Sequence, residues 1–275
     1  MTEPLSQEAP TPDGLLASAR DFSVEGRIVL ITGAGQGIGR EFARQFAAAG
    51  AISAVADINL DNAHTVVAEI EAAGGKAMAV AVDVGEKASV EAMTAQVKGR
   101  FGRLDVLLNN ASLFTTLKKQ PFDEIPVDVW ERVMKVNVTG IFLCCCAVAP
   151  MMREQGWGRI INISSASVPR GTVNYLHYVT SKSAIIGMTN SLARELGPHG
   201  ITVNGIRPGT VATEVKERVA ALTPEVRQRA MSLQCIPRGM EASDLVGLAL
   251  FLSTPAAGFI TGQTIACDGG YTHSA

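Results

Sequence analysis

The sequence predicts an α/β fold: a Rossmann-like, doubly wound parallel sheet of about seven strands, with helices on both faces, in a single domain. Short apolar, β-branched runs alternate with longer amphipathic segments from Arg27 onward. The runs are apolar on both faces, which is typical of strands buried within a parallel sheet. With 275 residues, of which 47% are hydrophobic and 18% charged, the chain is long enough to bury one large core.

The predicted elements follow in strict alternation. The apolar runs that predict strands are 27–32, 51–57, 76–83, 103–110, 158–164, 200–208 and 263–269. The segments with helical periodicity are 39–50, 60–74, 87–102, 127–156, 181–200 and 241–253. Gly50, Gly74 and Gly200 stand where left-handed caps are expected to end helices.

Two segments fall outside this alternation. Residues 1–25 contain three prolines and no basic residue before Arg20, so they lack the basic start and the apolar run of about 7–15 residues that a secretory signal needs. We expect a flexible leader there, followed by one domain over 26–275. Residues 211–239 add helical material between the last two strands, and we expect this insertion to cover a substrate site.

Composition narrows the classes of partner and compartment. The net charge is −2, without the clustered basic field that nucleic acid or an anionic membrane requires. No segment reaches the roughly 18 uncharged apolar residues of a membrane span. We therefore expect a soluble, cytoplasmic protein that binds small molecules and copies of itself.

Five cysteines are present, and Cys144, Cys145 and Cys146 are consecutive. Adjacent side chains on a helix point in different directions, so this run has neither the spacing of metal ligands nor that of a disulfide framework. We interpret the three as small apolar core residues that stay reduced, and we predict no metal site.

The first predicted strand runs into the glycine-rich stretch TGAGQGIG, residues 32–39. Glycines there let a phosphate approach the backbone, and the helix that follows presents free N–H groups and its positive dipole end. The common G-x-G-x-x-G pattern fails because Ile38 occupies the third glycine position, and the stretch fits T-G-x-x-x-G-x-G instead. The alternative is an ordinary glycine-rich turn.

Asp57 ends the second predicted strand, eighteen residues after Gly39. A carboxylate at this place can accept hydrogen bonds from both ribose hydroxyls of an adenosine, and it repels a 2′-phosphate. The alternative is an aspartate that caps the next helix, which would be compatible with NAD and with NADP.

The Thr32, Gly33, Gly37 and Gly39 pattern resembles that of the short-chain dehydrogenase/reductase family, and the resemblance extends from Arg27 to about Gly270. It implies a nicotinamide dinucleotide cofactor. NADP-preferring relatives carry a basic residue where this chain has Gln36 or just after the second strand, where it has Ile58 and Asn59. Together with Asp57, this favours NAD over NADP.

Further family motifs occur in the expected order. Asp83 and Val84 match the pair beside the adenine. Asn109, Asn110 and Ala111 match N-N-A-G, with Ser112 in place of its glycine, and the run from Pro208 to Thr213 matches P-G-x-x-x-T. The cofactor-binding residues that the resemblance implies are Thr32, Gly33, Gln36, Gly37, Ile38, Gly39, Asp57, Asp83, Val84, Asn110, Tyr178, Lys182, Pro208, Gly209, Val211 and Thr213.

The stretch NYLHYVTSK, residues 174–182, contains the candidate base for removing a hydroxyl proton. A phenol has a pKa near ~10 and needs a nearby cation to favour its phenolate at neutral pH. Lys182 is four residues after Tyr178, on the same helix face. Tyr175 lies seven before the lysine, about two turns or ~10 Å away, so the spacing selects Tyr178 as general base or acid.

Two further residues complete the catalytic set that the resemblance implies: Asn137, Ser165, Tyr178 and Lys182. Ser165 matches the family serine, whose hydroxyl holds the substrate oxygen; Ser164 is the alternative and points to the other face of the strand. Asn137 matches an asparagine that binds a water linking the lysine to solvent. Its alternative role is a local bend or a satisfied core polar group.

We place His177 on the helix surface or in a subunit contact rather than against substrate, because consecutive helical side chains diverge by about 100°. The resemblance implies a substrate pocket that includes Ser165, Arg170 and Tyr175, and Arg170 would suit a distant anionic or polyhydroxyl group.

The sequence favours an NAD-dependent oxidoreductase that transfers a hydride between a secondary alcohol or polyol, or the matching ketone, and the nicotinamide. The alternatives are an NADPH-dependent reductase like 3-oxoacyl-[acyl-carrier-protein] reductase and a non-catalytic nucleotide-sensing protein. The intact Tyr178 and Lys182 pair argues against the sensor. The resemblance also implies a homotetramer.

Overall fold

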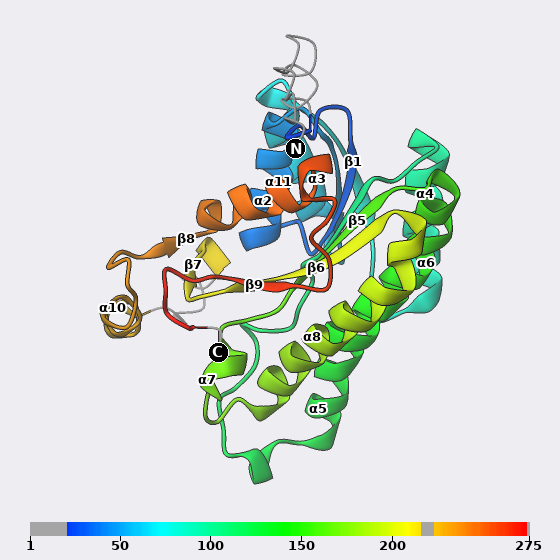
Figure 1. Ribbon diagram of the computed structural model, residues 1–275. Helices are drawn as coiled ribbons and strands as arrows, with labels where there is room; N and C mark the ends of the chain where they lie inside the picture. Colours follow the sequence, from blue (N-terminus) through cyan, green and yellow to red (C-terminus); the bar gives the residue numbers. More distant parts are fainter. Residues whose placement is uncertain (1–20, 216–222, 274–275) are drawn as a thin grey trace, which may run out of the picture.

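The computed structural model describes residues 21–215 and 223–273 (Figure 1). Most of the predicted leader, residues 1–20, lies outside the described residues, as does the part of the predicted insertion over 216–222. The described chain forms one seven-stranded sheet in the order β3-β2-β1-β4-β5-β6-β9, with helices on both faces. The predicted fold class is confirmed.

All strand pairs of this sheet are parallel. The strand order reverses between β1 and β4, and the crevice at such a switch point is where doubly wound folds bind ligands. The strands are β1 (Ile28–Thr32), β2 (Ile52–Asp57), β3 (Lys76–Ala81), β4 (Val106–Asn109), β5 (Gly158–Ile163), β6 (Ile201–Pro208) and β9 (Thr264–Cys267).

Successive β1 side chains enter two separate cores, because neighbouring residues of a strand face opposite sides of the sheet. Val29 and Ile31 pack in one core, and Leu30 packs in the other. The helices of the first core are α2 (Gly37–Ala48), α3 (Leu60–Ala72) and α11 (Val246–Leu252). Those of the second are α4 (Lys87–Phe101), α6 (Gly140–Gln155) and α8 (Leu176–Leu196).

The predicted helix over 127–156 is interrupted by a wider turn. It consists of α5 (Val127–Met134), a π-helical segment η2 (Lys135–Thr139) and α6. π-helical turns are rare and occur frequently at functional sites. Asn137 lies in this segment and is fully buried.

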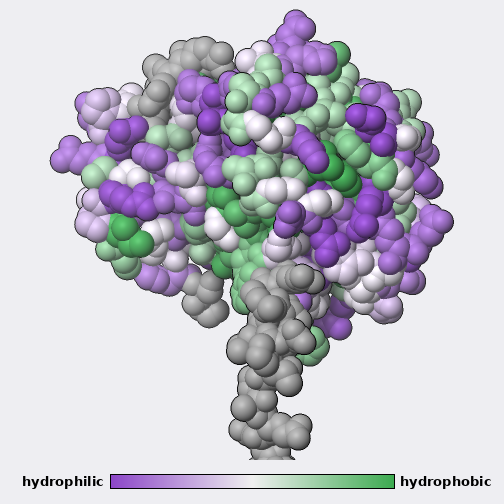
Figure 2. Space-filling model, turned by 90° about the horizontal axis from the view of Figure 1, so that it is seen from above, coloured by the Kyte–Doolittle hydropathy of each residue, from purple (hydrophilic) through white to green (hydrophobic). Residues whose placement is uncertain are grey.

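The stretch Val127–Gln155 is long and apolar enough to cross a membrane, by length and composition only. Its apolar face serves the core, since Ile141, Cys144, Val148 and Met152 are buried against the sheet. Cys144 and Cys145 are buried as predicted, and burial raises the pKa of the Cys144 thiol to about 12. Cys146 is exposed, so the predicted core role is wrong for this residue. Figure 2 shows hydrophilic residues spread over the visible face of the molecule, with apolar patches between them.

The segment after β6 and the residues before β1 add to this frame. β7 (Val211–Ala212) and β8 (Met240–Glu241) form a small parallel sheet, and α10 (Pro224–Ser232) lies between them in the chain. The part of the predicted leader that is described, 21–25, packs on the domain: Val24 is buried and the Phe22 ring stacks on Phe251.

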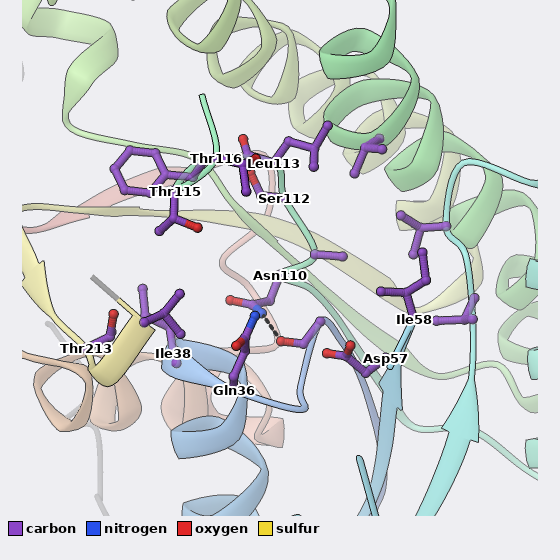
Figure 3. Close-up of a pocket in the computed structure, with 18 of the residues that line it drawn as sticks. Gln36, Ile38, Asp57, Ile58, Asn110, Ser112, Leu113, Thr115, Thr116 and Thr213 are labelled. Atoms are coloured by element: carbon purple, nitrogen blue, oxygen red, sulfur yellow. Dashed lines mark hydrogen bonds between the residues drawn. The ribbon is translucent and has the colours of Figure 1, made fainter. Parts of the chain in front are cut away.

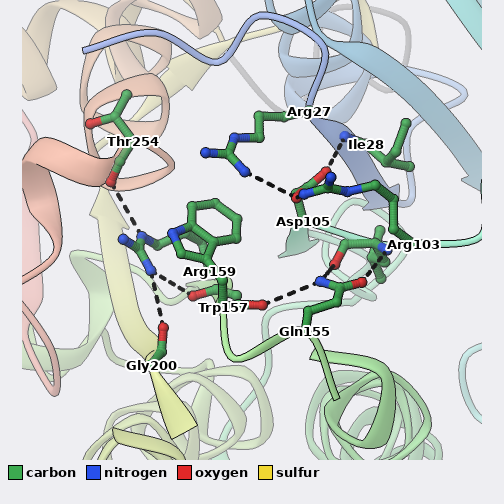
Figure 4. A network of polar contacts seen from close by, with 11 residues as sticks. Arg27, Ile28, Arg103, Asp105, Gln155, Trp157, Arg159, Gly200 and Thr254 are labelled. Atoms are coloured by element: carbon green, nitrogen blue, oxygen red, sulfur yellow. Dashed lines mark hydrogen bonds and ion pairs between the residues drawn. The ribbon is translucent and has the colours of Figure 1, made fainter. Parts of the chain in front are cut away.

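A polar network joins the amino ends of β1, β4 and β5 (Figure 4). Asp105 is fully buried, accepts a hydrogen bond of 2.8 Å from the Ile28 N–H, and pairs with Arg27 at 3.3 Å and with Arg103. The Trp157 ring lies 4.1 Å from the Arg27 guanidinium and 4.3 Å from that of Arg159. This network fixes the end of the sheet opposite the switch-point crevice.

Replacing Asp105 by alanine should therefore destabilise the fold. The variant leaves the buried Ile28 N–H without its acceptor and removes the partner of two partly exposed arginines, so we expect a loss of about 2 kcal/mol in the free energy of unfolding. Urea denaturation of Asp105→Ala and of the exposed Asp123→Ala measures this. Equal stabilities of the two variants would contradict the role assigned to the network.

Candidate active site

The loop between β1 and α2 follows a path that two glycines make sterically accessible. Gly33 has φ +63°, and a Cβ there would lie 2.8 Å from the Ala111 Cα. A Cβ on Gly39 would lie 2.2 Å from the Gly33 carbonyl oxygen. Any side chain at either position would push the loop away from β4 or from α2.

A pair of side chains fixes this loop to the end of β4. The Asn110 side-chain amide donates to the carbonyls of Thr32 at 3.0 Å and Gly33 at 2.9 Å, and Figure 3 shows the Asn110 side chain beside the loop. In return, the Thr32 hydroxyl accepts from the Asn110 N–H at 3.1 Å. Thr32 is buried behind the loop, so its side chain supports the loop from the core.

A cleft of about 360 Å³ opens at the carboxyl ends of β1, β2 and β4 (Figure 3). Its position is the switch point that the strand order defines. The predicted cofactor residues that line it are Gly33, Gln36, Gly37, Ile38, Asp57, Asp83, Val84, Asn110 and Thr213. The loop after β4 contributes further walls, including Ser112, Leu113 and Phe114.

The Asp57 carboxylate lies in the wall of this cleft at the end of β2. One oxygen accepts from the Gly35 N–H at 2.8 Å and the other from the Asn59 N–H at 2.9 Å. The cap of α3 is Asn59, whose side chain accepts from the Asn62 N–H. Asp57 is therefore not the helix cap that the sequence left as an alternative.

A second cavity, of about 130 Å³, adjoins the cleft, because Ile38, Asn110, Ser112 and Phe114 line both. It brings together three of the four predicted catalytic residues, Ser165, Tyr178 and Lys182. Its wall also includes the predicted cofactor residues Pro208, Gly209 and Val211.

Burial controls the protonation of the tyrosine and lysine. Burial raises the pKa of Tyr178 to about 12, and a hydrogen bond with Ser165 acts in the opposite direction. Burial also lowers the pKa of Lys182 to about 7. The Lys182 ammonium lies 5.7 Å from the centre of the Tyr178 ring and donates to the Ile163 carbonyl at 2.8 Å. The phenol pKa is therefore raised in this structure and not lowered as the spacing suggested, because desolvation is the largest effect on it.

The fourth predicted residue, Asn137, lines neither cavity and is hydrogen-bonded to the loop after β4 and to α8. Its side-chain oxygen accepts from the Leu113 N–H at 2.7 Å, and its amide donates to the Leu113 carbonyl and to the Ser181 hydroxyl at 3.0 Å. Ser181 in turn donates to the Tyr178 carbonyl at 2.7 Å. Asn137 thus connects the loop after β4 to the helix that holds the tyrosine.

Ser181 links Asn137 to the helix that holds Tyr178, a contact that the sequence analysis did not identify. It is fully buried and is the direct link between Asn137 and the backbone of Tyr178. Its place one residue before Lys182 was visible in the sequence, but its partner lies 44 positions away on the π-helical segment.

The histidine of this helix lies elsewhere than predicted. His177 is fully buried and not on the helix surface, and its ring meets Tyr175 edge-on at 5.4 Å between centroids. Burial lowers the pKa of His177. His177 lies on the same side of α8 as Ser181 and Ile185, which are also buried, and periodicity alone does not reveal this.

Two residues predicted for the substrate pocket lie away from both cavities. Arg170 is exposed, and its guanidinium stacks over the Tyr271 ring at 4.2 Å. Tyr175 is buried, donates its hydroxyl to the Phe114 carbonyl at 2.8 Å, and packs on the Tyr178 ring. Tyr175 therefore supports the loop and the tyrosine from behind.

Comparison with known proteins agrees with this geometry. A family model described as enoyl-(acyl carrier protein) reductase matches residues 33–272. The sorbitol dehydrogenase of Cereibacter sphaeroides is 38% identical over 256 residues, which cover 90% of this chain and 98% of that protein. The chain belongs to the short-chain dehydrogenase/reductase family.

Solved structures of family members have the same fold. A 7α-hydroxysteroid dehydrogenase complexed with NADH and 7-oxo glycochenodeoxycholic acid has a TM-score of 0.85 and 35% identity, covering 92% of this chain and 96% of that one. A gluconate 5-dehydrogenase from Burkholderia cenocepacia J2315, in complex with NADP and tartrate, has a TM-score of 0.87 and 32% identity, covering 94% and 100%. The protein is thus a nicotinamide-dependent oxidoreductase of this family, acting on hydroxyl or keto groups.

The buried lysine gives a test of the site's electrostatics. Below pH 7 the folded and unfolded chains both hold the Lys182 proton, and the full cost of burying the cation is present. As pH rises from about 7 towards the ordinary lysine value of 10.5, only the unfolded chain keeps that proton, so the wild type gains stability. The stabilisation of Lys182→Met relative to wild type should therefore be larger at pH 6 than at pH 9, by about 1–3 kcal/mol.

Urea denaturation at the two pH values measures this difference. The exposed Lys98→Met serves as the control, and its difference from wild type should not change with pH in the same way. A Lys182→Met effect that is equal at both pH values would contradict the lowered pKa.

Proposed function

We propose that the protein transfers a hydride between NAD and a secondary alcohol or polyol, or the matching ketone. The observation that carries this proposal is the junction of two cavities: the cleft that contains Asp57 continues into the cavity that contains Ser165, Tyr178 and Lys182. A dinucleotide lying along the cleft from Asp57 would bring its reactive ring to the hydroxyl groups of Ser165 and Tyr178. The cofactor supplies the acceptor or donor of the hydride.

The side chains divide the proton chemistry between them. Ser165 would donate a hydrogen bond to the substrate oxygen as charge develops on it. Tyr178 would accept the hydroxyl proton in oxidation and return it in reduction. Lys182, with a pKa of about 7, is populated in both protonation states near neutral pH. Its protonated form favours the Tyr178 phenolate, and its neutral form can take up a proton.

The preference for NAD rests on the charge beside the adenosine end of the cleft. The Asp57 carboxylate is held in place by the Gly35 and Asn59 N–H groups, so it cannot turn away from a 2′-phosphate without losing both hydrogen bonds. Ile58, the next residue in the cleft wall, offers no positive charge. One relative is complexed with NADH and another with NADP, so the comparisons leave this choice to the residues of the chain.

The shared walls of the two cavities favour a substrate with an apolar part beside the reacting hydroxyl, since Ile38 and Phe114 face both spaces. Of the two proposed classes, secondary alcohols have such an apolar part beside the hydroxyl, whereas polyols do not. We also propose that the protein is a soluble, cytoplasmic homotetramer. The composition supports the location, and the family resemblance supports the oligomeric state.

Tyr178→Phe tests the catalytic assignment. Because the variant lacks the proton acceptor, kcat/KM for alcohol oxidation should fall by about 10²–10⁴-fold, while the Kd for NADH changes by less than about threefold. Tyr175→Phe is the matched control, because it loses the hydroxyl bound to the Phe114 carbonyl and should reduce activity less than about tenfold. Similar losses in the two variants would contradict the role of Tyr178.

A spectrophotometric screen of alcohols, polyols, hydroxy acids and ketones with NAD and NADP identifies the substrate class. Hydride transfer only from NADPH to acyl thioesters would favour the acyl-carrier-protein reductase alternative. An inactive protein that still binds nucleotide would favour the sensor.

Asp57→Asn tests the cofactor preference. Removing the negative charge should raise the ratio of kcat/KM with NADP to kcat/KM with NAD by at least about tenfold, because the 2′-phosphate no longer meets a like charge. Asp83→Asn removes the other carboxylate of the cleft and should affect both cofactors equally. An unchanged ratio in Asp57→Asn would overturn the proposed NAD preference.

A further inference from the structure

An acidic side chain from a distant part of the chain is bound to the start of α2. The Glu214 carboxylate accepts a hydrogen bond of 2.7 Å from the Gly37 N–H, across 177 positions of sequence. The residues on either side of Glu214 also lie on this loop: a Cβ on Gly37 would be 3.7 Å from Val215 and 3.9 Å from Thr213. Glu214 is therefore held over the glycine-rich loop by its neighbours as well as by its own hydrogen bond.

The start of α2 is not capped by the side chain of its N-cap residue. Its N-cap residue, Gln36, makes no side-chain capping bond, and the first turn contains no acidic residue. A helix with free N–H groups and an uncompensated positive end attracts a negative charge. The Glu214 carboxylate supplies that charge, and a hydrogen bond to an ionised acceptor is stronger than a neutral one.

The field of Glu214 reaches further along α2. Glu69 is the main cause of the raised pKa of Arg40, and the charge of Glu214 makes a smaller contribution in the same direction. The open cavity beside this contact, of about 330 Å³, is lined by Glu41, Glu214 and Glu241 together with Arg227. Three carboxylates therefore surround this cavity. Among them, Glu214 accepts the hydrogen bond from the Gly37 N–H.

The same N–H group belongs to the part of the loop that would receive the phosphates of a dinucleotide under the proposed function. Backbone N–H groups at a helix start bind phosphate by the same attraction that holds the carboxylate. A carboxylate and a pyrophosphate are both negative and cannot share this donor. We propose that Glu214 competes with the cofactor pyrophosphate for the start of α2, so that binding the cofactor requires displacing this side chain.

This inference rests on the proposed function. It predicts that replacing Glu214 has opposite effects on two properties, the stability of the protein without nucleotide and its affinity for nucleotide. Without nucleotide, loss of the contact should destabilise the protein, because α2 loses its cap. With nucleotide, the same loss should strengthen binding, because the competitor is gone. A residue with only a structural role would weaken both.

The experiment compares wild type, Glu214→Gln, Glu214→Ala and the control Glu41→Gln. Glu41 lies on α2, in the same open cavity, and its side chain is hydrogen-bonded to Gln45 on the same helix. Kd values for NADH and NADPH are measured by isothermal titration calorimetry. Hydrogen exchange of a peptide that contains Gly37, together with Tm, is measured without added nucleotide.

We expect Kd for both nucleotides to fall by about 2- to 10-fold in Glu214→Gln, and at least as much in Glu214→Ala. The Tm without nucleotide should fall by about 1–3 °C in Glu214→Ala, with faster exchange at the start of α2. Glu41→Gln should leave Kd and exchange near the wild-type values.

The outcomes separate this inference from the proposed function. If the wild type binds neither nucleotide, the proposed function fails and this inference fails with it. If the wild type binds but both Glu214 variants bind equally or more weakly, only this inference is overturned. An improvement in Glu41→Gln as large as that in Glu214→Gln also overturns it, because the effect would then come from the general charge of the region.

Discussion

The active site depends on the junction between the carboxyl ends of β1 and β4. The Asn110 side chain binds the carbonyls of Thr32 and Gly33, and the Thr32 hydroxyl accepts from the Asn110 backbone. These bonds set where the glycine-rich loop leaves the sheet and how closely it passes Ala111. If this junction opened, the two cavities would lose the residues that line both of them, so the cleft and the reacting groups are positioned together.

The reacting groups are then arranged by a second set of contacts, centred on the π-helical segment. The wider turn at Lys135–Thr139 accompanies the burial of Asn137, whose amide is shared between the Leu113 backbone and Ser181. Through Ser181, this amide holds the backbone of Tyr178. The same enclosure that positions Tyr178 and Lys182 removes water from them, which raises the pKa of one and lowers that of the other.

The polar groups at the two ends of the sheet are satisfied in different ways. At the amino end, Asp105 and the arginines around it satisfy their hydrogen bonds within the chain, which favours stability. At the carboxyl end, the start of α2 is satisfied by a side chain from the segment after β6. A bond of this second kind can be exchanged for one to a ligand. This follows from the fold, because parallel strands direct the N-termini of the following helices to one edge of the sheet.

Much of the fold and of the candidate site could be predicted from the sequence. The alternation of apolar runs and helical segments is a local signal, and it predicted every strand of the main sheet. The glycine spacing and the four-residue separation of Tyr178 and Lys182 are also local, because both follow from the geometry of one loop and one helix. These signals selected the cleft residues and three of the residues that meet in the adjoining cavity.

The tertiary structure determined the side-chain positions and pKa values that depend on contacts between distant segments. Arg170 stacks on Tyr271, Tyr175 binds the loop after β4, and His177 is buried against the Tyr175 ring, because packing and not periodicity sets which helix faces are covered. The Tyr178 pKa also depends on enclosure by the whole domain, which spacing does not encode. Glu214 and Ser181 gain their partners only when segments 177 and 44 positions apart meet. The sequence by itself determined the fold and the chemical identity of the groups that we propose to react, and only the folded chain determined their protonation and their neighbours.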